Sequence, residues 1–126
     1  MILSQIAAKV EHKIHPVQAA TDQASLFNAC HCLCEAASTA YLDSSSLLNL
    51  ALDDDIEQIT GLLTQAADAM RSGIKRHGAH DDNNLIAAFA DNCDARASDL
   101  TQRYQRVVVS MRIKEAAMDL AEVDSV

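Results

Sequence analysis

Apolar residues between Leu52 and Ile74 recur at intervals of three and four residues, the spacing of one buried stripe along an α-helix. The members of this stripe are Leu52, Ile56, Ile59, Leu63, Ala66, Met70 and Ile74. Three acids open the segment, and Arg71, Lys75 and Arg76 lie near its end, so the charges at both ends complement the helix macrodipole. The pattern predicts a long helix over 52–74 around which the rest of the chain packs.

Turn-forming residues are scarce, because 126 residues include one proline and three glycines. A fold of many strands needs repeated turn signals, so this composition indicates an all-α protein. The length suits one domain with one core. We therefore expect a single helical domain over residues 1–126, folded as an antiparallel bundle of four to five helices.

The other helices are predicted from apolar spacing and from capping residues. A first helix over 1–15 is ended or kinked by Pro16, and a second begins near Thr21 or Asp22 and runs to about Leu42. A polar break over 43–46 precedes a short apolar run over 47–51. The segment 77–83 combines glycine, histidine and aspartate, which predicts a loop.

The last predicted helix is unusually long, because a helical spacing without proline or glycine runs from Leu85 to Met118. Its stripe contains Leu85, Phe89, Cys93, Ala97, Leu100, Tyr104, Val107, Met111 and Met118. Two outcomes stay open: the helix breaks near 91–98, or it projects and pairs with a second copy as a homodimer through 85–118. Charges of opposite sign border the stripe and would set the register of such a pair: Arg96, Arg103 and Lys114 on one edge, and Asp94, Glu115 and Asp119 on the other.

The formal net charge of −8 disfavours direct binding to nucleic acid or to an anionic membrane. The start of the chain does not have the pattern of a secretory signal, and no apolar run approaches the ~20 residues of a membrane span. We expect a soluble, cytoplasmic protein with reduced cysteines.

Acidic residues at the start of the central helix are the leading candidates for a binding site. Asp53, Asp54, Asp55 and Glu57 fan outward from a helix start, which does not match the alternating ligands of a calcium loop. The chain carries no glycine-rich phosphate loop, nucleophile elbow or zinc-protease motif, and we expect neither a cofactor nor an enzyme activity. We expect a small bacterial or phage inhibitor or regulator that covers a basic catalytic or nucleic-acid-binding site on a protein partner.

A second hypothesis rests on basic and imidazole groups at the other end of this helix, namely Arg71, Arg76, His77 and His80. Such a cluster suits chemistry on phosphate. Five residues separate Arg71 from His77, which resembles the Arg-x(4–6)-His motif of the helical HEPN ribonucleases. That family usually has a polar residue such as asparagine directly after the arginine, whereas this chain has Ser72 and then Gly73. The resemblance implies RNA cleavage by Arg71 and His77 within a dimer.

A third hypothesis is a metal or redox sensor built on Cys30, Cys34 and Cys93. On one helix Cys30 and Cys34 share a face while Cys32 points to the other side, so one ion cannot collect all three. A zinc site would need further ligands from Cys93, His77 or His80. Small thiols packed in an alanine-rich core are the simpler explanation, and in that case no metal is bound.

Overall fold

Helices make up nearly all of the chain in a computed structural model, which describes the backbone of residues 2–124 and the side chains of residues 2–121. The elements are α1 (Ile2–Ala19), α2 (Gln23–Ser45), the short 3-10 helix η1 (Leu48–Leu50), α3 (Asp53–His77) and α4 (Asn83–Asp124). The described part of the chain contains no β-strand, so the predicted all-α class is confirmed.

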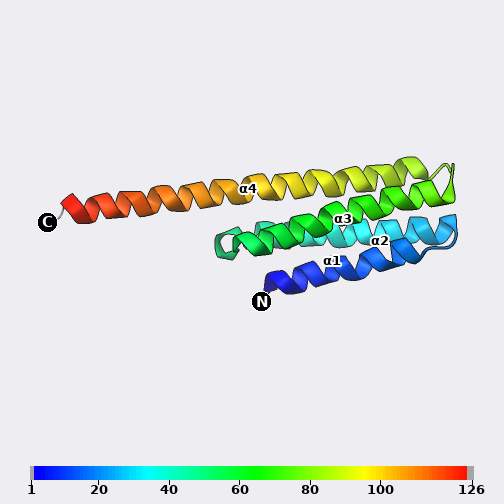
Figure 1. Cartoon of the computed structure of the whole chain (residues 1–126), viewed down its shortest axis with the longest axis horizontal. Coiled ribbons are helices and arrows are strands. Elements are labelled where there is room, and N and C mark those ends of the chain that lie inside the picture. The colour runs from blue at the N-terminus through cyan, green and yellow to red at the C-terminus, as the bar shows by residue number, and fades with distance from the viewer. Residues whose placement is uncertain (1, 125–126) are drawn as a thin grey trace.

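The four α-helices form two antiparallel hairpins that pack side by side as a bundle (Figure 1). Helix α2 runs antiparallel to α1, and α4 runs antiparallel to α3. Each hairpin is packed internally, while α1 also packs on α3 and α2 also packs on α4. The most extensive contact between helices joins α3 to α4.

Specific side chains mark the ends of the helices. Asp22 is the N-cap of α2, where its carboxylate accepts a hydrogen bond of 2.7 Å from the backbone N–H of Ser25. This bond holds the pKa of Asp22 below its usual value. Gly78 ends α3 with a φ of 77°, a backbone conformation that residues with a Cβ rarely adopt.

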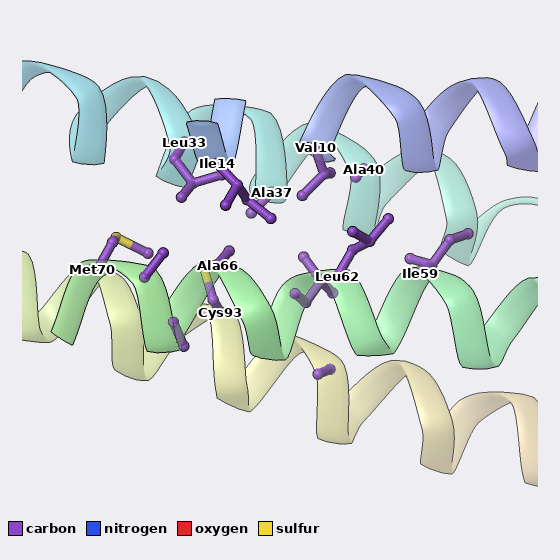
Figure 2. Close-up of a cluster of buried hydrophobic side chains, with 14 of the residues drawn as sticks. Val10, Ile14, Leu33, Ala37, Ala40, Ile59, Leu62, Ala66, Met70 and Cys93 are labelled. Carbon is purple, nitrogen blue, oxygen red and sulfur yellow. The ribbon is translucent and has the colours of Figure 1, made fainter. Parts of the chain in front are cut away.

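The core lies between the two hairpins, where α3 supplies the largest share of buried side chains (Figure 2). Five members of its predicted stripe are buried: Ile56, Ile59, Leu63, Ala66 and Met70. The two outermost members differ, since Leu52 is exposed at the N-cap position and Ile74 is half-buried. The buried Gly73 permits close approach of α2, because a Cβ there would lie 2.6 Å from Cδ1 of Leu26.

Two details of the predicted helices are wrong. Of the two effects predicted for Pro16, an end of the helix is excluded, since α1 continues to Ala19; one proline removes only one N–H donor and the surrounding packing holds the last turn. The stripe of α4 begins at Ile86, which is fully buried, while Leu85 is largely exposed. Counting back from Cys93 in steps of three and four residues leads to Ala90 and Ile86 instead of Leu85.

Helix α4 is continuous and extends far beyond the end of the bundle (Figure 1). Of the two outcomes left open, the break near 91–98 is absent and the helix projects, while its pairing with a second copy stays a prediction. We call residues 109–124 the projection, a segment about 24 Å long at 1.5 Å per residue. Within residues 2–124, no helix has both the length and the apolar character needed to cross a membrane.

Candidate functional site

The acidic start of α3 lies at the open end of the bundle, beside the point where α4 leaves it. Two of the four candidate acids have structural partners. Asp55 accepts a hydrogen bond of 3.0 Å from the backbone N–H of Leu52, and Asp53 accepts one of 2.6 Å from the Tyr104 hydroxyl. Asp54 and Glu57 are exposed and point toward solvent. Two of the four acids, Asp53 and Asp55, therefore stabilise the fold, and the other two, Asp54 and Glu57, are available for binding.

Tyr104 fastens α4 to the start of α3 at the last turn before the projection. Its hydroxyl donates to Asp53 and lies 3.4 Å from the backbone carbonyl of Ala51. The bond to Asp53 raises the pKa of Tyr104 to about 12, because the neighbouring carboxylate disfavours the phenolate. This contact defines a junction: Leu100 is fully buried one turn earlier, and every described residue from 109 onward is exposed.

The projection carries apolar residues in two stripes on opposite sides of the helix. The bundle-side stripe continues the buried face of α4 beyond Leu100 and the half-buried Val107, and within the projection it consists of Met111 and Met118. The outer stripe consists of Val109, Ile113, Ala116 and Leu120. At 100° per residue the two stripes lie about 170° apart. Neither stripe is covered by the bundle beyond Val108.

The bundle-side stripe and the end of the bundle together form a step, with the projection as its wall and the start of α3 as its ledge (Figure 1). Met111 and Met118 line the wall and are 46% and 65% exposed. Asp54 is exposed in the first turn of α3, and Glu57, about one turn further along, is exposed at the edge of a groove that it lines with Thr101 and Gln102 of α4. The step therefore offers an apolar surface next to negative charge, and methionine adapts well to varied contacts.

The basic and imidazole residues at the other end of α3 contact different neighbours. Arg71 forms ion pairs with Asp91 at 2.9 Å and Asp94 at 2.7 Å on α4, which raise its pKa. His77 and Arg76 instead contact backbone carbonyls next to the turn between α1 and α2, those of Ala20 and Val17. His80 lies 3.1 Å from the carbonyl oxygen of His77. The structure therefore does not bring Arg71 and His77 to one reacting centre.

The cysteines differ strongly in exposure. Cys30 and Cys93 are fully buried, and burial raises the pKa of each thiol to about 12. Cys34 is half-buried with a raised pKa, and Cys32 is exposed. Figure 2 shows Cys93 among the packed core side chains near Ala66. Across the described residues, no three His, Cys, Asp or Glu side chains are grouped so that they could hold a metal ion. High thiol pKa values also disfavour the thiolate that a metal or an oxidant requires.

Two parts of this region were missed by the sequence reasoning. The pairing of Asp53 with Tyr104 joins positions 51 residues apart and leaves no local pattern. The outer stripe does leave one, since Val109, Ile113, Ala116 and Leu120 follow a 4-3-4 spacing. The main stripe of α4 is longer and dominates the apolar pattern of this helix.

Comparison of the chain with protein-family models, with curated proteins and with solved structures gave no match.

Proposed function

We propose that this protein is a non-enzymatic protein-binding module, an inhibitor or regulator whose partner presents a basic surface. One observation carries the proposal: α4 continues beyond the bundle with its apolar residues uncovered, directly beside the acidic start of α3. The partner would seat apolar side chains against Met111 and Met118 and place basic groups near Asp54 and Glu57. Two copies of the chain would also associate through α4.

The energetics of the projection support a binding role. A helix of this length without tertiary contacts is only marginally stable in water, because nucleation is costly and packing supplies most helical stability. Exposed apolar residues arranged in stripes gain free energy when a partner covers them. A projection of this kind is therefore most stable in a complex.

The charge distribution supports a basic partner. The chain carries a formal net charge of −8, and Asp54 and Glu57 add local negative potential at the ledge of the step. Such a field accelerates association with a positively charged surface and weakens association with nucleic acid. An acidic module of this size could cover a catalytic or nucleic-acid-binding site on its partner.

The test is affinity capture from a lysate of the host, with mass spectrometry of bound protein and assay of bound nucleic acid. Met111→Asp removes the apolar wall, and the pair Asp54→Asn and Glu57→Gln removes the charge of the ledge. Asp68→Asn is the matched control, since Asp68 is exposed on the same helix but packs toward the end of α1, away from the step.

We expect the wild type and the Asp68→Asn variant to retain the same protein. Met111→Asp should lower its recovery about tenfold or more, since one central apolar contact commonly contributes more than 1.4 kcal/mol. RNA incubated with the protein should remain intact. Capture of RNA alone, equal capture by all variants, or RNA cleavage that is lost in His77→Ala would each overturn the proposal.

A further inference from the structure

The outer stripe of the projection faces away from the bundle, so no other part of the described chain can cover it. Its large members are well exposed, with Ile113 at 63% and Leu120 at 66%. A shallow groove follows this face and is lined by Arg106, Val109 and Ile113 among others. The spacing of four, three and four residues is that of one strand of a two-helix coiled coil.

The apolar character of this face is confined to the projection. Where α4 runs along the bundle, the residues that lie at the same angle around the helix are polar or small: Asn84, Asp91, Ala95, Ser98 and Gln102. A face of the projection that only solvent covered would have no physical reason to be apolar from Val109 onward. The change in composition coincides with the point where α4 leaves the bundle.

We propose that the outer stripe is the surface through which two copies of this chain pair, with their α4 helices antiparallel. Self-association is part of the proposed function, and this inference rests on that proposal because it names the surface that would mediate it. In the antiparallel register, Ile113 lies beside Ala116 of the second copy, and Val109 lies beside its Leu120. The two-fold axis passes between Lys114 and Glu115, so each contact occurs twice.

The charges that border the outer stripe favour this register. On one edge, Arg112 of each copy lies opposite Asp119 of the other, which gives two reciprocal ion pairs. On the other edge, Ser110 lies opposite Ala117, and both side chains are small enough for a close approach. In a parallel pair Arg112 would face Ala117 instead and find no carboxylate. Charge complementarity therefore selects the antiparallel orientation.

The shape of the molecule permits this pairing. Each bundle packs on the side of α4 opposite its outer stripe, so the two bundles lie on opposite sides of the helix pair and do not collide. The helices overlap over residues 109–120, about 18 Å at 1.5 Å per residue. This contact is small, so we expect a dimer that forms reversibly as the concentration rises through the micromolar range.

Sedimentation velocity of the full chain over micromolar to millimolar concentrations tests the proposal. Ile113→Asp should weaken self-association about tenfold or more, because it buries a charge in the centre of the stripe. Met111→Asp is the matched control: it introduces the same charge two residues away on the opposite side of the same helix, and it should leave the dimer intact. Circular dichroism checks that both variants keep their helix content.

Charge reversal tests the orientation. Arg112→Glu or Asp119→Arg alone should weaken the dimer, because each places like charges opposite one another. The double variant should restore wild-type association. Four results would overturn the proposal: a monomer at every concentration, a dimer lost in Met111→Asp but kept in Ile113→Asp, equal effects of the two substitutions, or no rescue by the double variant. A monomer that still captures the basic partner would overturn this inference alone and leave the binding function in place.

Discussion

Substitution of Gly73 by alanine tests how tightly the two hairpins pack. The added methyl carbon would lie 2.6 Å from Cδ1 and 3.4 Å from Cδ2 of Leu26. Carbon atoms pack at about 3.5–4.0 Å, so the closest contact overlaps by about 1 Å. Leu26 is fully buried and cannot turn toward solvent. Overpacking of this kind lowers the free energy of unfolding by about 1–3 kcal/mol.

Gly61→Ala on the same helix is the matched control. Gly61 is exposed, and a Cβ there meets no atom within 4 Å. The substitution should raise the free energy of unfolding by about 0.5–1 kcal/mol, because alanine favours the helix more than glycine does. The same gain operates at Gly73, so the difference between the two variants isolates the steric cost, about 1–3 kcal/mol.

Urea denaturation followed by circular dichroism measures both variants. Each kcal/mol corresponds to about 4 °C in Tm for a domain of this size. In a Leu26→Ala background the clash is absent, so Gly73→Ala should then stabilise the fold as much as Gly61→Ala does. If Gly73→Ala in the wild-type chain is as stabilising as Gly61→Ala, a Cβ at position 73 does not clash with Leu26.

Three further predictions address the junction, the thiols and the projection. In an alkaline titration followed by phenolate absorbance, Tyr104 should titrate near pH 12, and Asp53→Asn should bring its pKa back toward 10. Because the pKa of Tyr104 is raised in the folded state, the stabilisation from the Tyr104–Asp53 bond is complete below pH 10 and disappears as the pH rises to about 12. Titration of Tyr104 near pH 10 in the wild type would contradict this prediction. Of the four thiols, Cys32 alone should react rapidly with a thiol reagent in the native protein, whereas all four should react in denaturant. Rapid reaction of the buried Cys30 and Cys93 in the native protein would contradict their packing in the core. A chain that ends at Val108 should unfold with a free energy within about 0.5 kcal/mol of the full chain, and a larger loss would show that the projection packs on the bundle.

The fold was largely predictable because its signals are local. The apolar stripe of α3, the cap at Asp22 and the glycine at position 78 each depend on a few neighbouring residues. These signals agree with the packing that the structure contains. Helix type and helix order therefore follow from the sequence with little need for tertiary information.

The continuity of α4 was not decidable from sequence. The segment 91–98 contains residues of low helix propensity, which left a break open. In the structure Asp91 and Asp94 pair with Arg71, while Cys93 and Ala97 are buried against the rest of the bundle. Tertiary contacts thus keep this segment helical, although its own helix propensity is weak.

The candidate sites were less predictable, because they depend on which neighbour each side chain meets. Arg71 and His77 lie close in sequence, yet one contacts α4 and the other contacts the turn after α1. Likewise, nothing near Asp53 in the sequence indicates that Tyr104 binds it. The outer stripe is the exception, since its spacing is visible once α4 is known to project.

The most direct test of the binding account is photo-crosslinking in the host cell. In one variant a photoreactive amino acid replaces Met111 on the wall of the step. In a second, separate variant it replaces His12, an exposed residue on α1. We expect an adduct between position 111 and another protein, and no such adduct at position 12. Equal adducts at the two positions, or no adduct at position 111, would contradict the claim that the projection is the binding element.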